Sequence, residues 1–424
     1  MPCPKGGAVT KLENEATSIQ QFRNWSMLEK KRRLERSGIP VRFGRNAVHS
    51  RGLTQHYVIQ TAHFRTLQLV RVMHSAGRVT GREEMSLEQE LPIQQRRMIR
   101  MAIKALYTLG LDAGEVRISA VSDGKYAVHE IMAEPWKEDA VLKSLYLKAV
   151  KEHAEELQHE MLEPAQLLIG MDPEFVLVRD SDRKIVPASR FLDRFGQVGC
   201  DAVIRGGRRS YPIAELRPIP SRDPRGLLHH LVQTLSQASG RITDRTLIWQ
   251  AGSMPQRGLP LGGHIHFSGV LLTGDLLRAL DHYLALPVSL LEDRRGVGRR
   301  PKYGVLGDYR SKSYGGFEYR TLPSFLVSPL LAKGVIGLAY LIAGSYRQLK
   351  RRDLDQEELH RAYYEGDPAP LRAAAGPILQ DLRSLKAYAK YESYIEPLLQ
   401  KVESGSTWDE TRDIRSFWKL PTGP

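Results

Sequence analysis

The sequence predicts an α+β protein in two parts: an N-terminal α/β region, and a larger region in which strands come first and helices follow. The chain has 424 residues, which is too long for one ordinary hydrophobic core and suggests two or three domains. Short strand-like segments lie between residues 166 and 322, and helical patterns follow from about residue 330. A charged helical pattern over residues 140–162 connects the two parts. We therefore divide the chain into residues 1–164 and 165–424.

The composition indicates a globular protein and argues against a disordered, secreted or membrane protein. The hydrophobic fraction of 42% and the charged fraction of 26% are typical of a globular protein and exclude a disordered one. The two cysteines, Cys3 and Cys200, cannot form a disulfide framework and fit a reducing cytoplasm. Residues 1–20 lack the apolar segment of a signal peptide, and the most apolar run, 335–343, is shorter than the roughly 20 residues that span a bilayer. We expect a cytoplasmic protein with no membrane partner and a buried helix at 335–343.

The net charge of +14 favours acidic partners such as nucleotides, phosphates or nucleic acid. The basic run Lys30–Arg33 lies in a helix-like stretch over residues 19–36, where a solvated helix face explains it better than a nucleic-acid contact does. No aromatic residues interleave with this run to stack on bases. A basic nucleic-acid-binding protein is therefore the alternative with the least support, and nucleic acid is not expected as a partner.

The N-terminal region predicts a small mixed fold. Residues 57–75 have strand and helix character, and residues 87–109 predict a helix that Gly110 ends. Residues 115–120 and 126–132 predict two strands joined by a turn.

Part of this region resembles the late part of ATP-grasp ligases, in which a helix leads through an L-G-x-D turn into strands that end in a metal-binding E-x-N. The resemblance lies in residues 105–116, within a possible degenerate segment over residues 95–135. At the place of the E-x-N stands Glu130-Ile131-Met132, so the amide ligand is missing. An ordinary helix and hairpin explains the segment equally well.

Four strand-like segments of the second region carry polar residues two positions apart. Alternate side chains of a strand point to the same face, so each pair shares one face while its apolar neighbours share the other. One such pair is ordinary for a half-buried strand, but four built only from Asp, Glu, His and Arg predict a shared site. The pairs are Asp172/Glu174, Glu215/Arg217, His264/His266 and Glu318/Arg320.

These residue types indicate a particular chemistry. Carboxylates suit Mg²⁺, and imidazoles also suit Mn²⁺ or Zn²⁺. Arg217, Arg310 and Arg320 cannot be metal ligands, but they bind anions such as phosphates. Carboxylates, metals and arginines together predict nucleotide phosphoryl transfer. The basic, glycine-containing loop over residues 294–304 could fold over a polyphosphate, or could be a mobile loop without function.

The last part of the chain predicts helices that cover the strands. They are expected at residues 332–346, 370–390 and 394–403, with a charged connection over residues 353–369.

The ordered motifs of the second region closely resemble the phage phiEco32-like carboxylate–amine ligases, predicted amidoligases related to glutamine synthetase and glutamate–cysteine ligase. The resemblance covers roughly residues 167–330 and implies a curved, mainly antiparallel sheet of glutamine-synthetase-like type backed by helices. It also implies that ATP and two or more Mg²⁺ or Mn²⁺ ions bind on the concave face. The motifs are GMDPEF (170–175), AELRP (214–218), LGGHIHF (261–267), YGVLGDYR (303–310) and FEYRTLPS (317–324).

The resemblance also implies a role for each site residue. The metal ligands would be Asp172, Glu174, Glu215, His264 and Glu318. The contacts to ATP would be His266, Arg217 and Arg310, and the residues that act on the transferring group would be Arg310, Arg320 and Glu215. One departure is Asp172, where glutamine synthetase has the first Glu of a Glu-x-Glu; the shorter side chain keeps the charge but changes the reach by about one methylene.

The implied reaction begins when a substrate carboxylate attacks the γ-phosphate of ATP, and an amine then captures the acyl phosphate to form an amide. The acyl phosphate must be shielded from water, which would give a closing basic loop a purpose. The carboxylate and amine substrates could be amino acids, peptides or cell-wall fragments. The alternative is a zinc-dependent hydrolase that uses His264, His266 and a glutamate.

Overall fold

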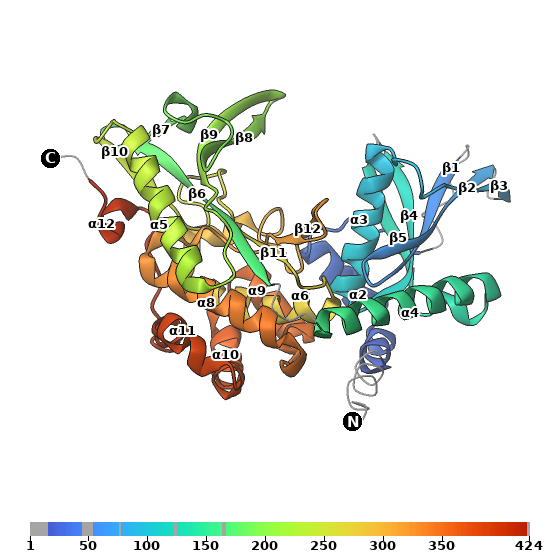
Figure 1. Ribbon diagram of the computed structural model, residues 1–424. Coiled ribbons are helices and arrows are strands. Elements are labelled where there is room, and N and C mark those ends of the chain that lie inside the picture. The colour runs from blue at the N-terminus through green and yellow to red at the C-terminus, as the bar shows by residue number, and fades with distance from the viewer. Residues whose placement is uncertain (1–15, 45–53, 76–77, 123–124, 163–166, 422–424) are drawn as a thin grey trace. The chain divides into compact units, whose positions relative to one another are not determined.

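The computed structural model describes residues 16–44, 54–75, 78–122, 125–162 and 167–421 (Figure 1). The chain forms two compact units, Met1–His159 and Glu160–Pro424. The division falls near the end of the helix α4, Ala140–Leu162, which the charged pattern predicted. The boundary expected after residue 164 lies outside the described residues.

The N-terminal unit is a five-stranded antiparallel sheet, in the order β3-β2-β1-β4-β5, with the helix α3 packed on one face. Leu106 of α3 packs with Ile59 and Val116 of the sheet in the core. After α3 the chain turns at Gly110, whose φ of +78° is a left-handed conformation that favours glycine. The elements are α2 (Met27–Arg36), β1 (Thr54–Ala62), β2 (Arg65–Ser75), β3 (Arg78–Glu84), α3 (Ile93–Thr108), β4 (Ala113–Ser122) and β5 (Lys125–Met132).

The elements of this unit differ from the predicted ones in three places, and one of these differences has a local cause. Residues 57–75 contain two strands and no helix, and the helix expected from residue 87 begins only at Ile93. The helix-like stretch over residues 19–36 is two helical segments, because Ser26 starts a new helix. Its side chain caps the backbone N–H of Glu29, and Glu29 in turn accepts from the backbone N–H of Ser26.

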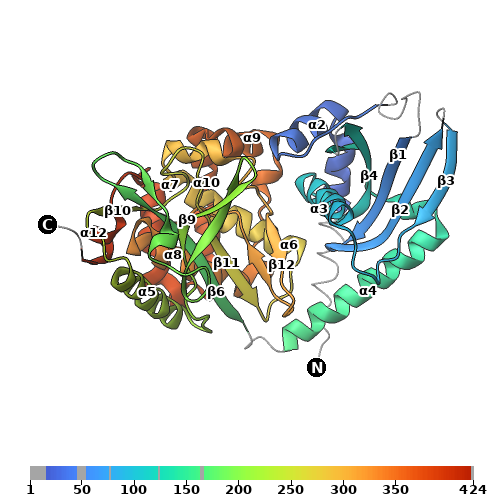
Figure 2. The same ribbon diagram turned by 90° about the horizontal axis from the view of Figure 1, so that it is seen from above.

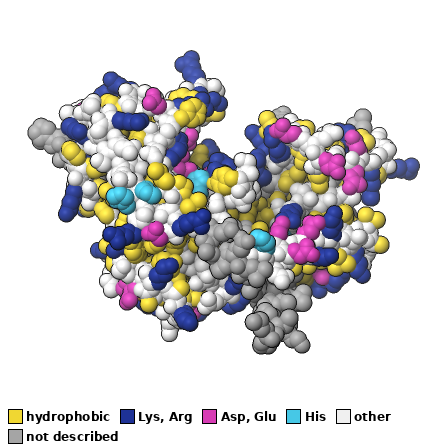
Figure 3. All heavy atoms as spheres, viewed as in Figure 1, with side chains coloured by type: hydrophobic (Ala, Val, Ile, Leu, Met, Phe, Trp, Pro, Cys, Tyr) yellow, Lys and Arg dark blue, Asp and Glu magenta, His cyan; other side chains and the backbone are white. Residues whose placement is uncertain are grey.

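The basic run in α2 is partly used for packing. Arg33 is buried, and its Nε donates to the carbonyl oxygen of Thr108 at 2.7 Å. The Lys30 ammonium lies 3.8 Å from the centre of the Phe22 ring. Figure 3 shows Lys and Arg side chains scattered over the visible face of the molecule. These contacts give half of the basic run a structural role within its own unit.

The C-terminal unit contains an eight-stranded sheet whose main order is β12-β13-β11-β6-β9-β8, with β10 and β7 also paired to β6. Each of these pairings is antiparallel, so the predicted mixture of helices with a mainly antiparallel sheet is confirmed. The strands are β6 (Leu168–Arg179), β7 (Ile185–Val186), β8 (Val198–Arg205), β9 (Arg208–Leu216), β10 (Leu247–Gln250), β11 (Gly263–Ser268), β12 (Tyr309–Ser311) and β13 (Phe317–Tyr319).

Helices cover one side of this sheet: Figure 1 shows α8, α10 and α11 there, and Figure 2 shows α8 and α10. The apolar helix expected at residues 332–346 is α8, and it is almost entirely buried. The segment Pro329–Gln348 is long and apolar enough to cross a membrane, but 78% of its apolar window is buried inside the unit, as in the core helix of a folded domain. The helices are α5 (Pro224–Arg241), α6 (Gly274–Leu280), α7 (Leu286–Leu291), α8 (Pro329–Ser345), α9 (Glu357–Glu365), α10 (Pro368–Ser384), α11 (Tyr388–Glu403) and α12 (Ile414–Trp418).

Two predictions about the C-terminal helices were wrong. The charged connection expected over residues 353–369 contains the helix α9, which buries Leu359 and Tyr363 and ends at Gly366 in the left-handed conformation. The single helix expected over residues 370–390 is broken between α10 and α11, where neither glycine nor proline marks the break. Leu385 has an extended conformation at the break, and its side chain is buried.

Candidate active site

The register of the strands brings the four polar pairs onto one sheet. On the central strand β6, Asp172 lies opposite His264 of β11, and Glu174 lies opposite Glu215 of β9. On the other side of β11, Glu318 of β13 lies opposite His266 of β11 and Arg310 of β12. Because residues opposite each other in an antiparallel pair point to the same face, the predicted site residues share one face.

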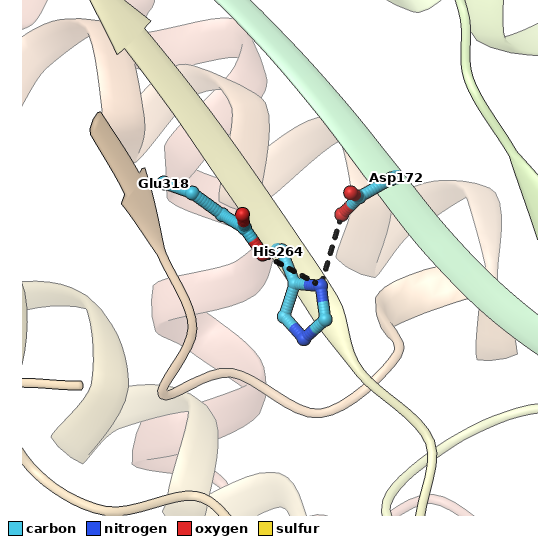
Figure 4. A group of neighbouring side chains, drawn as sticks. All are labelled: Asp172, His264 and Glu318. Carbon is cyan, nitrogen blue, oxygen red and sulfur yellow. Dashed lines mark ion pairs between the residues drawn. The ribbon is translucent and has the colours of Figure 1, made fainter. Parts of the chain in front are cut away.

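Three of these residues converge on one point (Figure 4). His264 Nδ1 lies 3.1 Å from Asp172 Oδ1 and 3.4 Å from Glu318 Oε1. Asp172 Oδ1 is buried, yet it makes no hydrogen bond of good geometry. In the described part of the chain, no other group of three His, Cys, Asp or Glu residues places one donor atom each within 4.8 Å of the others. This arrangement can hold a metal ion.

The other imidazole of the pair contacts the same aspartate from a different side. His266 Nε2 lies 2.9 Å from Asp172 Oδ2, and His266 is not part of the convergent group. Burial opposes ionisation of Asp172, but the two imidazoles outweigh it and hold the pKa of Asp172 below its usual range. Burial also disfavours a charged His264, but Asp172 and Glu174 outweigh it and raise the pKa of His264. The site therefore pairs an ionised carboxylate, Asp172, with an imidazole, His264, that can be cationic or bind a metal.

Glu174 and Glu215 lie beside the convergent group. Glu174 is buried and accepts a hydrogen bond from the backbone N–H of Gly262 at 2.7 Å. Burial raises the pKa of Glu174 to about 7. Glu215 forms a short ion pair with Arg217, which also donates to the carbonyl oxygen of Gly196 at 3.1 Å. Arg217 is thus held by protein groups at one end of the site face.

Three cations surround the buried carboxylate of Glu318. Lys312 Nζ lies 2.6 Å from Oε2, and Arg310 approaches the same oxygen at 3.3 Å. Arg320 lies 2.8 Å from Oε1. Burial raises the pKa of Glu318, but the hydrogen bond from Lys312 and the charge of Arg320 outweigh it and lower the pKa. Positive charge therefore exceeds what this one carboxylate needs, and an anion would be bound well here.

Lys312 is a candidate site residue that the sequence prediction missed. It stands two positions after Arg310, and β12 ends at Ser311 between them. Extending the alternation rule one step beyond the strand would have placed Lys312 on the same face as Arg310. Asp308 was missed as well; its carboxylate lies 3.7 Å from Arg320 Nε.

A cavity of about 340 Å³ opens beside the convergent group. Its wall includes Glu174, His264 and Arg320, and the hairpin of β8 and β9 contributes further lining residues. Cavities of this size accept small organic ligands. Apolar and charged side chains both face it, among them Asp201, Val203, Arg205, Ile213, Leu259, Lys302 and Tyr303.

The basic loop after α7 is held in place by carboxylates. Arg299 and Arg300 are buried, and both contact Glu292, at 3.5 and 2.8 Å. Arg295 binds Asp293 at 2.7 Å. These arginines have partners inside the protein, so the loop is anchored at them, while its later residues Lys302–Gly304 line the cavity.

Comparison with known proteins assigns the C-terminal unit to a family. Residues 169–420, more than half of the chain, match the family model described as phage phiEco32-like COOH.NH2 ligase-type 2. No curated protein matches the chain. Among solved structures, a bifunctional glutathione synthetase from Pasteurella multocida is similar at 13% identity and a TM-score of 0.37, over 63% of this chain and 54% of that one.

The chain thus spans about half the length of the glutathione synthetase, and a TM-score of 0.37 does not establish a common fold. The family match, in contrast, extends over nearly the whole C-terminal unit and includes all five motifs of the site face. It confirms the resemblance that these motifs indicated. The chain therefore belongs to the family of phage phiEco32-like carboxylate–amine ligases of type 2.

Proposed function

We propose that this protein is an ATP-dependent ligase that joins a carboxylate to an amine through an acyl phosphate. The family supports a carboxylate–amine ligase in general. The observation that carries the finer proposal is the convergence of Asp172, His264 and Glu318 next to three cations. Phosphoryl transfer needs metal ligands beside cationic groups, because the transferring group carries negative charge in the transition state.

The convergent residues fit a divalent cation. Neighbouring ligands of an octahedral Mg²⁺ lie about 3 Å apart, close to the separations of 3.1 and 3.4 Å around His264. The buried Asp172 Oδ1, which lacks a hydrogen bond, is a free acceptor for such an ion. Two carboxylates and one imidazole favour Mg²⁺ or Mn²⁺. Glu174 and Glu215, opposite each other on adjacent strands, would hold a second ion.

Each residue of the site face has a task in this reaction. A bound metal neutralises charge on the phosphates. Arg310, Arg320 and Lys312 bind the γ-phosphate while a carboxylate oxygen of the substrate attacks its phosphorus and ADP leaves. His266 and Arg217 contact ATP. The amine then attacks the acyl carbon, inorganic phosphate leaves, and the amine nitrogen loses a proton.

The cavity beside Glu174 is the proposed place for a substrate. It has room for a small carboxylate or amine, such as an amino acid or the end of a peptide or cell-wall fragment. Shielding there would protect the acyl phosphate from hydrolysis. We further expect a sheet of glutamine-synthetase-like type and a cytoplasmic location.

The experiment is a screen of carboxylate and amine pairs for release of ADP by the full-length protein in Mg²⁺. Release that needs both substrates, and hydroxamate formation when hydroxylamine replaces the amine, would support an acyl phosphate. ATP binding that is the same in wild type, Glu318→Ala and His264→Ala would contradict the proposal, since both side chains lie in the proposed metal site.

The zinc hydrolase has less support from the geometry. It requires both imidazoles on one ion, whereas His266 contacts Asp172 from outside the convergent group. Metal analysis of the purified protein separates the two functions: tightly held stoichiometric zinc would favour the hydrolase, and loosely held Mg²⁺ or Mn²⁺ the ligase.

A further inference from the structure

The carboxylate of Glu318 is fully engaged by protein groups in the structure. It is 1% exposed, with Lys312 and Arg310 on Oε2, and Arg320 with His264 on Oε1. The contact from Lys312, at 2.6 Å, is the shortest of the four. A divalent cation that enters this site would meet the Lys312 ammonium one carboxylate away, and two like charges so close repel strongly in a buried environment.

Lys312 holds Oε2 of Glu318 more closely than the more exposed Arg310 does, and it too is able to move. Its side chain is a flexible four-carbon stem, and 23% of it is exposed. The backbone around it is fixed in a tight turn: the N–H of Lys312 donates to the carbonyl oxygen of Gly316, and the N–H of Gly315 donates to the carbonyl oxygen of Lys312. Arg320, in contrast, also contacts Asp308. A movement of Lys312 away from Glu318 therefore needs only its side chain to move.

We infer that Lys312 couples the binding of the metal to the binding of the nucleotide. Without nucleotide, its ammonium stays on Glu318 and keeps the affinity for a divalent cation low. When a metal–ATP complex enters, the ammonium moves to the terminal phosphate oxygens, which removes its repulsion on the metal and takes the nearest cation away from Oε2 of Glu318. This inference rests on the proposed ligase function. It gives Lys312 two roles: it lowers the affinity of the empty site for a metal, and it binds phosphate when ATP is present.

The coupling predicts that removing the charge of Lys312 changes the affinity for the metal and the affinity for the nucleotide in opposite directions. Removing the charge in Lys312→Met should raise the affinity for Mn²⁺ without nucleotide, by about tenfold, because the repulsion is gone. The same change should lower the affinity for an ATP analogue in the presence of Mn²⁺, by about tenfold, because a charged hydrogen bond is lost. A merely structural role for Lys312 would weaken both. In wild type, linkage requires the metal and the nucleotide to strengthen each other equally.

The test is a titration of the full-length protein with Mn²⁺, in which free Mn²⁺ is followed by electron paramagnetic resonance with and without β,γ-imido-ATP. The variants are Lys312→Met, Lys312→Arg, which keeps the charge, and Lys401→Met, which removes an exposed lysine of α11. Lys401→Met should behave as wild type, and Lys312→Arg, which keeps the positive charge, should keep the affinity for Mn²⁺ without nucleotide low. Thermal melts confirm that all variants are folded, and if Lys312→Met does not fold, Lys312→Gln, which also removes the charge, takes its place.

The outcomes separate this inference from the proposed function. Higher Mn²⁺ affinity with lower analogue affinity in Lys312→Met supports the coupling. Equal affinities in Lys312→Met and wild type, or a loss of both, overturn it while the ligase proposal stands. If wild type itself binds neither the analogue nor Mn²⁺ in its presence, the proposed function fails, and the coupling fails with it.

Discussion

The two sheets of this protein carry the same types of polar residue, which form a structural network in one sheet and a candidate active site in the other. In the N-terminal sheet, Glu115-Val116-Arg117 of β4 repeats the pattern of Glu215-Leu216-Arg217, at the end of β9. Histidines accompany both patterns, with His56, His74 and His129 in the N-terminal sheet and His264 and His266 in the C-terminal one. The pattern of pairs along one strand is therefore not enough to identify a site.

Polar groups of the N-terminal sheet are linked from neighbour to neighbour. Glu115 accepts from Gln60 and Arg117, both at 2.8 Å, and Arg117 also binds Glu130 at 2.8 Å. The histidines form a second chain: His74 contacts His56 at 2.8 Å, and His129 contacts Ser119 at 2.9 Å. Only a few buried atoms of this network, such as Gln60 Oε1, have no partner.

The C-terminal site differs because its groups converge. Donor atoms from β6, β11 and β13 face one point, and three cations gather on one carboxylate. Charges that satisfy one another in pairs stabilise a fold, whereas an excess of like groups at one point calls for a ligand. Convergence across strands thus distinguishes the candidate active site from the polar network of the other sheet.

The largest effect is expected at Glu318. Glu318→Gln keeps the shape but removes the charge that balances the metal, and we expect ligase turnover to fall about a thousandfold. ADP release at saturating substrates measures it. The single amide oxygen can accept from Arg320 or from Lys312, which bind different oxygens of the carboxylate, so a thermal melt must show that the variant is folded before turnover is compared. Turnover within threefold of wild type would show that the convergent group is only structural.

The second effect concerns the histidines of the two sheets. His264→Ala removes one of three convergent donors, so the affinity for Mn²⁺ with nucleotide should fall about ten- to a hundredfold. His56→Ala, a matched change in the N-terminal sheet, should leave it unchanged. Calorimetric titration with Mn²⁺ compares them. If His56→Ala weakens Mn²⁺ binding as much as His264→Ala does, the distinction between the two sheets is wrong.

A third effect compares the two matched Glu–Arg pairs. Glu215→Gln should lower turnover about tenfold, because Glu215 faces Glu174 at the proposed second metal position. Glu115→Gln should leave turnover within about twofold but lower the free energy of unfolding by about 1–3 kcal/mol, since a buried acceptor of two hydrogen bonds is weakened. Turnover and urea denaturation of both variants decide. Equal losses of turnover in Glu215→Gln and Glu115→Gln would mean that convergence does not distinguish a pair in the active site from a structural pair.

The sequence could predict which residues share the site face, but it could not predict which of them converge on one point. Alternation within a strand placed Asp172 with Glu174 and His264 with His266, because the period of two is a local property. Which residues meet depends on register between strands far apart in the chain: β6 and β11 are separated by some ninety residues, and no local signal sets their alignment. Register sets His264 opposite Asp172 and His266 opposite Glu318, and Glu318 contacts His264 diagonally across the strands.

The same limit explains the missed Lys312 and the anchored basic loop. Lys312 lies one residue beyond a three-residue strand, so only alternation extended past the end of that strand could have placed it on the site face. The run Arg299-Arg300 looked like a free cationic segment, but Glu292 lies close enough in the fold to bind both. Charge in a sequence shows which groups are present, while the fold decides which of them are already neutralised.

The smallest effect is a pH dependence in the N-terminal unit. Burial lowers the pKa of His56 to about 4, helped by nearby imidazoles and arginines, namely His129, His74, Arg117 and Arg82. The unfolded chain keeps a histidine pKa of about 6.5. Between these values the unfolded state binds the proton and the folded state does not, so stability falls as pH drops from about 6.5 to about 4.

We expect His56 to account for about 1–2 kcal/mol of that loss once solvent screening is allowed for. Urea denaturation at pH 7.5 and pH 5 measures the loss, followed by a fluorescence probe in the N-terminal unit. His56→Gln should flatten the dependence, because an amide of similar polarity does not titrate. An unchanged slope in His56→Gln would show that His56 is not the titrating group, and the low-pH loss would then have to come from other groups, such as His129, whose pKa burial also lowers.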